Sequence, residues 1–383
     1  MDYFLDELQS TVKQMARTIA EEKILPVRAQ LDEMEEFPRA IMKDLADTDL
    51  LGVYIPEEYG GLGGGCFELC LVTEELSRVC AGVAVSYAAN SLGSYTLLEY
   101  GSDKQKQRYL PDIARGKMLA AFALTEESAG SDASAIKTTA TRTDKGYILN
   151  GTKLFITNGG EADIYTVIAL TDKERGVRGA SAFLVEKDTP GFSFGRKEKK
   201  LGIRASATRE LFFENCPVPA ENIIGREGAG FPMIMRLFDR SRPGIGAQAV
   251  GVAQGAMEAA LEHAKNRIQF EHPIISFQAV QHMLANMATD IEAARALVYG
   301  AARTIDSGAK DFSMESAMAK VFASDVAMRV ATDAVQILGG VGYMRDYPVE
   351  KMMRDAKITQ IYEGTNQVLR NVIASELRKK KTL

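Results

Sequence analysis

Tryptophan is absent from this sequence of 383 residues, and histidine occurs only three times, at His263, His272 and His282. None of the histidines shows H-E-x-x-H spacing, and no C-x-x-C pair could complete a zinc site, so we expect no metal. A G-x-S-x-G motif is missing too, which with so few histidines argues against a Ser-His-Asp hydrolase. Acid–base chemistry in this chain would therefore fall to carboxylates.

Strong net charge and long apolar runs are also lacking. The net charge is −5 and the two signs are interspersed, so no basic face predicts a nucleic-acid partner. No apolar stretch is long and charge-free enough to span a bilayer, and we expect no membrane contact. The first residues are acidic where a secretory signal needs positive charge, and the four cysteines form no small disulfide scaffold. We therefore expect a cytoplasmic protein.

The pattern of residues divides the sequence into three parts. A chain of this length exceeds what one hydrophobic core usually serves, and its 46% apolar residues can supply several cores. Residues 1–119 follow helical periodicity, residues 120–225 alternate as strands do, and residues 226–383 return to helical periodicity. We expect an α+β fold that is mainly α, with a helical N-terminal domain, a middle β domain and a helical C-terminal domain.

The middle domain carries the strand signals. The segment Thr139–Gly151 alternates across a D-K-G turn, as a hairpin does. Further runs are rich in β-branched and aromatic residues: Ile164–Leu170, Ala180–Glu186 and Glu210–Glu214. These patterns predict a compact antiparallel β domain.

The C-terminal domain carries one long apolar stripe. Its members recur every three or four residues: Ala319, Phe322, Val326, Val330, Ala334 and Ile337. Long helices with such stripes usually form a bundle, and the stripe can continue into an oligomer interface.

A glycine-rich turn at residues 56–65 could be taken for a phosphate-binding loop. It does not fit G-x-G-x-x-G, and no strand–helix–strand unit surrounds it, so it is not a Rossmann phosphate loop. We interpret it as a flexible connection.

One carboxylate has an unusual setting, in the stretch I-Y-E-G-T-N-Q from Ile361 to Gln367. A glutamate taken at random is a solvated surface residue. Glu363, however, follows Ile361 and Tyr362 behind an apolar run, and lost hydration would raise its pKa toward neutrality. Such a group could remove a proton from carbon.

Two polar stretches in the middle domain combine hydroxyls with small residues: A-F-A-L-T-E-E-S-A-G-S-D (Ala121–Asp132) and L-F-I-T-N-G-G (Leu154–Gly160). Small residues let backbone N–H groups approach a planar or anionic ligand. Taken alone, each stretch is equally a polar turn, because these residue types dominate turns.

Together with three C-terminal stretches, these motifs resemble the acyl-CoA dehydrogenase family, flavoenzymes that desaturate the α,β bond of an acyl-CoA thioester. The further stretches are R-I-Q-F from Arg267 with F-Q at residues 277–278, Q-I-L-G-G-V-G-Y from Gln336, and I-Y-E-G-T-N-Q. The resemblance covers nearly the whole chain. It implies a helical N-terminal domain, a β-barrel-like middle domain and a C-terminal four-helix bundle, with FAD between the last two. It also implies a homotetramer built as a dimer of dimers.

The resemblance assigns roles residue by residue. Glu363 matches the catalytic base, Thr125 the hydroxyl at the flavin's pyrimidine edge, and Thr157 the residue near flavin N5. Phe155 stands where many relatives have tryptophan, and its ring can still cover the flavin with less area. The implied FAD contacts are Phe122, Leu124, Thr125, Ser131, Phe155, Ile156, Thr157, Arg267, Gln278, Gln336, Ile337, Leu338, Gly339, Gly340, Thr365 and Gln367.

Some of these contacts would cross to a neighbouring subunit. Arg267 and Gln278 match residues that hold the partner's FAD diphosphate and adenosine, where a fork of donors suits phosphate oxygens. The loop Gln336–Gly340 matches one that cradles the same cofactor. Glu271 stands where the family usually has glycine, which is awkward if the backbone needs a positive φ or if a phosphate lies nearby.

On the substrate side the matching residues are Ser131, Asp239, Arg242, Tyr362 and Gly364. Arg242 has a structural alternative, because Arg-Pro at a helix start can simply pair with Asp239. Tyr87 together with Tyr362 indicates a short, branched or cyclic acyl group.

The implied reaction removes the α-proton to Glu363 while the β-hydrogen leaves as hydride to flavin N5. The Glu363 backbone N–H would help to polarise the thioester carbonyl, as an oxyanion site does. Electrons would pass on to an electron-transferring flavoprotein. Two alternatives remain open: an acyl-CoA oxidase or nitroalkane-oxidase-like flavoenzyme, and a catalytically silent oligomeric scaffold.

Overall fold

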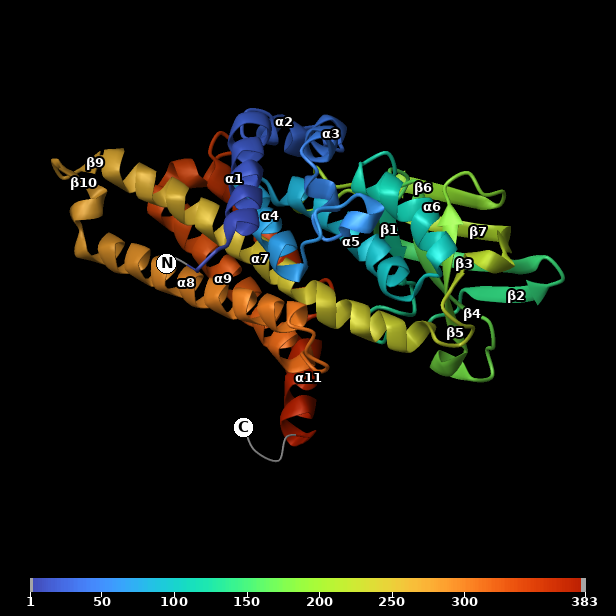
Figure 1. Cartoon of the computed structure of the whole chain (residues 1–383). Helices are drawn as coiled ribbons and strands as arrows, with labels where there is room; N and C mark the ends of the chain where they lie inside the picture. Colours follow the sequence, from blue (N-terminus) through green and yellow to red (C-terminus); the bar gives the residue numbers. More distant parts are fainter. Residues whose placement is uncertain (1–2, 380–383) are drawn as a thin grey trace.

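A computed structural model describes residues 3–379, so Asp2, part of the acidic start, lies outside the described residues. A β sheet lies at one end of the molecule, and long helices extend from it to the other end (Figure 1). The first part of the chain is helical: α1 (Glu7–Ile19), α2 (Arg28–Glu33), α3 (Arg39–Asp47), α4 (Cys66–Val79), α5 (Ala81–Tyr100) and α6 (Asp103–Ala114). In the described part, no helix combines the length and apolarity needed to cross a bilayer.

Helix α4 is the centre of the N-terminal part. Its residues are buried on nearly every side, and α1, α5, α7 and α8 all pack against it. A helix that is covered all round can be apolar all round, which is why α4 and α5 show little amphipathicity. The surface helix α1, by contrast, begins with a capping box in which Asp6 accepts the Gln9 N–H at 2.8 Å.

The middle of the chain forms one eight-stranded sheet in the order β6-β7-β3-β2-β4-β5-β8, with β1 paired to β4. The strands are β1 (Ala120–Ala123), β2 (Thr139–Thr143), β3 (Gly146–Thr157), β4 (Ile164–Leu170), β5 (Ala180–Glu186), β6 (Phe192–Lys197), β7 (Thr208–Pro219) and β8 (Ile223–Ile224). The predicted hairpin is confirmed by β2 and β3, and the three predicted runs by β4, β5 and β7.

The prediction of a purely antiparallel domain is wrong in one place. Strand β1 runs parallel to β4, with Ala120 opposite Ile164, and β2 also touches β4 in a parallel sense. All four residues of β1 are buried, so the strand has no alternation, and its partner lies forty residues away or more. Local pattern cannot choose the direction of such a pairing.

The C-terminal part holds α7 (Gly230–Asn266), α8 (Gln278–Asp306), α9 (Ser313–Leu338), α10 (Pro348–Thr359) and α11 (Asn366–Lys379). Helices α7 to α10 pack on one another, and α11 projects from the body (Figure 1). The predicted stripe on α9 is buried except at Phe322, which is 39% exposed. That residue was wrongly included, because it lies at the edge of the stripe while Ala323 and Lys320 face inward.

The glycine-rich turn at residues 56–65 is a closely bonded structure. The N–H groups of Leu62, Gly63 and Gly64 donate to the carbonyls of residues 52, 55 and 53 at 2.9 to 3.1 Å. A Cβ on Gly61 would meet the Ile55 carbonyl oxygen at 2.1 Å, so the chain passes too close to itself for a side chain. Our interpretation of this segment as a flexible connection is therefore wrong.

Glu271 lies in the tight turn between β9 (Ile268–Gln269) and β10 (His272–Pro273). Phe270 and Glu271 have φ values of +50° and +66°, as a two-residue hairpin turn requires. The positive φ is therefore one reason why glutamate is unfavourable at position 271. Glu271→Gly is expected to raise the free energy of unfolding by about 1 kcal/mol, because glycine adopts this conformation without steric cost.

Thermal unfolding followed by circular dichroism checks this prediction. Glu271→Ala is the matched control, since it removes the same carboxylate but keeps the Cβ. An equal gain in both variants would assign the effect to charge and contradict the backbone argument.

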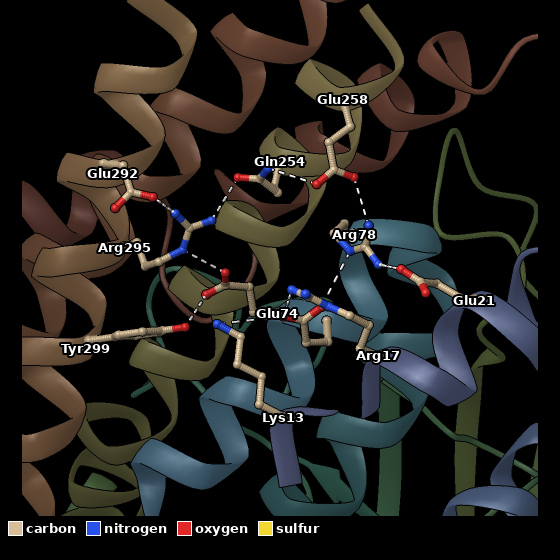
Figure 2. Close-up of polar contacts among 11 residues, drawn as sticks. Lys13, Arg17, Glu21, Glu74, Arg78, Gln254, Glu258, Glu292, Arg295 and Tyr299 are labelled. Carbon is tan, nitrogen blue, oxygen red and sulfur yellow. Dashed lines mark hydrogen bonds and ion pairs between the residues drawn. The ribbon is translucent and has the colours of Figure 1, made fainter. Parts of the chain in front are cut away.

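Charged side chains join the two helical parts of the molecule (Figure 2). Arg295 on α8 donates from Nε to Oε1 of Glu74 on α4 at 2.8 Å, and both side chains are buried. Arg78 on α4 pairs with Glu258 on α7 at 2.8 Å. Because a buried charge that loses its partner is strongly destabilising, the Arg295–Glu74 pair helps to fix how α4 docks on α8, while the more exposed Arg78–Glu258 pair adds a peripheral contact.

Candidate active site

Glu363 lies in the short loop between α10 and α11. Its φ is +51° and that of Gly364 is +95°, so two successive residues have left-handed backbone. The loop is closed by a hydrogen bond from the Asn366 N–H to the Gln360 carbonyl at 3.0 Å. A left-handed glutamate costs about 1–3 kcal/mol, and residues with such strain cluster at functional sites.

Helix α7 supplies the partners of Glu363. The Ser241 hydroxyl donates to Oε2 of Glu363 at 2.5 Å, and Arg242 Nε faces the Glu363 carbonyl oxygen at 3.5 Å. Arg242 also pairs with Asp239 at 2.5 Å, which confirms the ion pair expected from the sequence. The expected helix start is wrong, however, because Pro243 lies inside α7. Proline has no N–H, so it leaves the Asp239 carbonyl without its helical donor.

The surroundings of Glu363 raise the pKa of its carboxyl group above the usual value. Burial is the largest cause, and it outweighs the Ser241 hydrogen bond and the positive charges of Arg242 and Lys320, which act in the opposite direction. The direction agrees with the sequence-based expectation. A carboxylate whose pKa is raised is a better proton acceptor than an ordinary glutamate.

Tyr362 and Tyr87, which the sequence analysis assigned together to the acyl group, lie in different parts of the structure. Tyr362 donates its hydroxyl to Gln248 on α7, next to Glu363, and burial raises its pKa. Tyr87 is fully buried and donates to the Leu50 carbonyl at 3.1 Å, inside the N-terminal core. Its hydroxyl is therefore used in packing.

The two polar stretches of the middle domain lie side by side. The Leu154 N–H donates to the Thr125 carbonyl at 2.8 Å. Beneath them Lys153, fully buried, donates to the Leu124 carbonyl at 3.0 Å and pairs with Glu126 at 2.6 Å. The ion pair holds both stretches in one surface, on which Thr125 and Thr157 are half-buried.

This surface meets α7 close to Glu363. The rings of Phe122 on β1 and Phe238 on α7 contact edge to face, with centroids 5.9 Å apart. The Phe238 carbonyl accepts a hydrogen bond from Ser241, which is also the donor to Glu363. The structure therefore brings the middle-domain stretches and the Glu363 loop to the same helix.

The exposed groups on this surface fit a large planar cofactor. Phe155 has φ +56° and is 64% exposed, so an apolar ring is held outward at a strained position. A Cβ at Gly130, in the first of the two stretches, would meet nothing within 4 Å, which leaves room for a ligand against the backbone. An apolar face, hydroxyls and accessible backbone donors are the groups that an isoalloxazine and a diphosphate need.

Other residues that the resemblance implicated lie elsewhere. Arg267 and Gln278 flank β9 and β10, at the end of the molecule opposite the sheet (Figure 1). Helix α7, which separates them from the middle domain, has 37 residues and is therefore about 55 Å long. A single chain cannot bring these residues to the surface that carries Thr125. Ser131, Gln336 and Gln367 are exposed, and Thr365 accepts the Val368 N–H at 3.2 Å at the start of α11.

Sequence reasoning missed two residues that face Glu363. Ser241 stands beside Arg242 in R-S-R-P, and a hydroxyl there carries no strong signal. Lys320 is fully buried on α9. A lysine inside the apolar run A-M-A-K-V-F-A was a usable signal, because lysines are almost never fully buried unless paired.

Comparison with protein families gives three matches in chain order. The acyl-CoA dehydrogenase N-terminal domain matches residues 6–117, the middle domain residues 121–216 and the C-terminal domain residues 228–378.

Known proteins similar to this chain agree with these matches. A short-chain specific acyl-CoA dehydrogenase of Clostridium acetobutylicum is 46% identical over 378 residues, which cover 98% of this chain and 100% of the relative. The structure of butyryl-CoA dehydrogenase from Megasphaera elsdenii superposes with a TM-score of 0.96 at 46% identity, covering 99% of this chain and 100% of that one. A chain in a structure described as the electron transferring flavoprotein of Acidaminococcus fermentans gives a TM-score of 0.97 at 50% identity, covering 99% and 100%.

The predicted fold class is confirmed by these structures, and the expected cofactor by the family itself. The chain belongs to the acyl-CoA dehydrogenase family and is an FAD-dependent acyl-CoA dehydrogenase.

Proposed function

We propose that this enzyme desaturates the α,β bond of a short-chain acyl-CoA thioester, with Glu363 as the base that takes the α-proton. The observation that supports this role is the half-buried Glu363 carboxyl between Ser241 and the cations of Arg242 and Lys320. A group that must lift a weakly acidic proton from carbon benefits from a raised pKa. Bound FAD would supply the acceptor for the β-hydrogen, which leaves as hydride.

The proposed cofactor contacts lie mainly on the two adjoining stretches of the middle domain. Phe122, Leu124, Thr125 and Ser131 on one side and Phe155, Ile156 and Thr157 on the other would hold the flavin. Thr365 and Gln367, at the start of α11, would extend the same site. On the substrate side, Asp239 and Arg242 would contact the CoA part, while Tyr362 and Gly364 would border the acyl group and the thioester.

A homotetramer of two dimers is part of the proposal. Arg267, Gln278 and the segment Gln336–Gly340 would serve the FAD of a second copy, since their own chain's flavin stretches are too distant. Two aromatic side chains near them are strongly exposed, Phe270 at 87% and Tyr343 at 77%, as expected of a surface that a partner covers.

Partners and location complete the proposal. The acceptor of electrons would be an electron-transferring flavoprotein, which the similar Acidaminococcus structure supports. The four cysteines are free and buried, which fits the reducing cytoplasm. We also propose the domain boundaries at residues 119/120 and 225/226.

Anaerobic mixing with butyryl-, octanoyl-, isovaleryl- and glutaryl-CoA tests the substrate class. Butyryl-CoA should bleach the flavin fastest, because two short-chain relatives are close in sequence and structure. Faster bleaching by octanoyl-CoA would reject the short-chain assignment. Peroxide release in air would favour the oxidase alternative, and a colourless protein that FAD cannot reconstitute would favour the silent scaffold.

The pH dependence of bleaching provides a prediction for Ser241. Its hydrogen bond lowers the pKa of Glu363, so Ser241→Ala should raise that pKa further. The base must be deprotonated to react, and the rate therefore rises with pH through the Glu363 pKa. In Ser241→Ala the acidic limb of the rate–pH profile is expected at higher pH. Thr96→Ala is the control. It also removes a buried hydroxyl, but one that, unlike that of Ser241, has no hydrogen-bond partner within residues 3–379, so it should leave the acidic limb in place.

A further inference from the structure

Lys320 is a buried lysine that the reaction described above does not use. It stands on α9, its side chain is fully buried, and within residues 3–379 it forms no salt bridge. Its ammonium donates instead to two neutral acceptors, the Gly364 carbonyl at 2.7 Å and Asn366 Oδ1 at 3.0 Å. Burying a cation without an ion-pair partner is unfavourable, so stability alone does not account for a lysine at this position.

Both acceptors belong to the loop that carries Glu363. Gly364 follows Glu363 directly, and its φ of +95° turns the carbonyl toward α9. Asn366 is itself anchored on α9, because its amide donates to Ser324 Oγ at 2.9 Å and to Asp325 at 2.8 Å. The left-handed backbone at Glu363 is thus held from one side by α9.

The opposite side of the loop is held by α7. Ser241 binds the Glu363 carboxylate and Arg242 faces its carbonyl oxygen. Strained backbone persists only where its surroundings hold it, so losing either helix contact would weaken the restraint on the left-handed conformation of Glu363. On the α9 side Lys320 supplies the positive charge and Asp325 the negative one.

The charged groups around Lys320 are Glu363, Arg242 and Asp325. The pKa of Lys320 is lowered to about 7, mainly by burial, which the charge of Glu363 opposes; Arg242 acts with burial and Asp325 against it. In return the positive charge of Lys320 lowers the pKa of Glu363 against the effect of burial. The two groups therefore influence each other's protonation close to neutral pH.

We propose that Lys320 is a positioning residue for the catalytic base: it grips the Gly364 carbonyl and the Asn366 amide, fixes the left-handed Glu363 loop, and favours the carboxylate by its charge. This proposal rests on the proposed role of Glu363. It does not require Lys320 to touch substrate or FAD.

Rapid anaerobic mixing of the FAD-loaded Lys320→Met protein with butyryl-CoA, over a range of pH, tests it. At saturating substrate the rate of bleaching should fall by about 10²-fold, the loss that a small displacement of a reacting group produces. The acidic limb should move to higher pH, because the cation that favoured the carboxylate is gone. The substrate concentration at half-maximal rate should change much less than the rate.

Two further variants separate positioning from packing. Lys320→Gln keeps a hydrogen-bond donor without the charge, so it should recover part of the rate but keep the displaced limb. Ser316→Ala lies one turn earlier on α9, where the buried hydroxyl has no hydrogen-bond partner among the described residues, and it should behave as the parent protein. A parent-like rate and limb in Lys320→Met would overturn the proposal.

A failure of the Lys320 variants to fold with FAD would also decide the question. If neither Lys320 variant can be obtained with FAD bound while Ser316→Ala can, Lys320 is a structural residue and the proposal is rejected. Failure of the proposed function looks different, because Glu363→Gln would then still bleach with substrate. An inactive Glu363→Gln protein combined with an unaltered Lys320→Met protein would reject only the role of Lys320.

Discussion

Glu363→Gln is expected to give a yellow, folded protein whose flavin bleaches about 10⁴-fold more slowly with butyryl-CoA, the upper end of what one general base contributes. Glutamine keeps the shape of the side chain and can still bond Ser241, but it cannot accept the α-proton. Stopped-flow absorbance under anaerobic conditions measures the rate. Retained bleaching would reject Glu363 as the base.

The stability of Glu363→Gln relative to the parent protein also has an expected direction. Burial raises the folded-state pKa of Glu363, so the protonated form is favoured by folding and the ionised form is disfavoured. That contribution to stability is present at low pH and is lost as pH rises through the folded-state pKa. Above it, Glu363→Gln should therefore unfold at a temperature no lower than the parent protein.

Glu35→Gln is the matched control for both measurements. Glu35 is also half-buried and left-handed, with φ +53°, but it lies just after α2. Its replacement should leave the bleaching rate unchanged. A loss of rate in this control would mean that substitution at strained glutamates damages the protein generally.

Arg295→Met is expected to lower the free energy of unfolding by about 3–5 kcal/mol, the usual cost of breaking a buried ion pair by removing one partner. Glu74 would remain buried with Tyr299 as donor, at 2.9 Å, and without its cation (Figure 2). Arg295 also donates to Gln254 on α7 at 2.9 Å, so the loss would loosen the docking of three helices. Because the chain has no tryptophan, urea unfolding is best followed by far-UV circular dichroism.

Two controls define the cause of that loss. Arg329→Met removes an arginine from the pair with Asp290, which joins α9 to α8 at 2.7 Å, but Arg329 is half exposed. Exposed pairs contribute about 0–1 kcal/mol, so this variant should unfold nearly as the parent does. Adding Glu74→Gln to Arg295→Met should recover stability, since it removes the stranded charge. If the double variant were less stable than Arg295→Met, lost packing rather than an unpaired charge would be the cause.

The middle domain illustrates how far local pattern reaches. Strands β4 and β5 were predicted with the residues they have, because β-branched runs bounded by turn residues need only their own sequence to be recognised. The direction of β1 was not predicted, because its pairing with β4 is set by where α5 and α6 deliver the chain. The exposure of Phe322 was missed for a similar reason, since a stripe of period 3.6 does not fix which residue lies at its edge.

By itself, the sequence determined the three-part layout, the lack of metal-binding patterns, and the identity of the carboxylate in I-Y-E-G-T as the candidate base. Those properties depend on residue types and spacings that are local. Only the tertiary structure decided that Ser241 and Lys320, 122 and 43 positions before Glu363, meet the same loop, and that Arg267 lies far from its own chain's flavin stretches. Burial, strained backbone and electrostatic contacts arise when distant helices pack, so a single sequence carries only indirect signs of them.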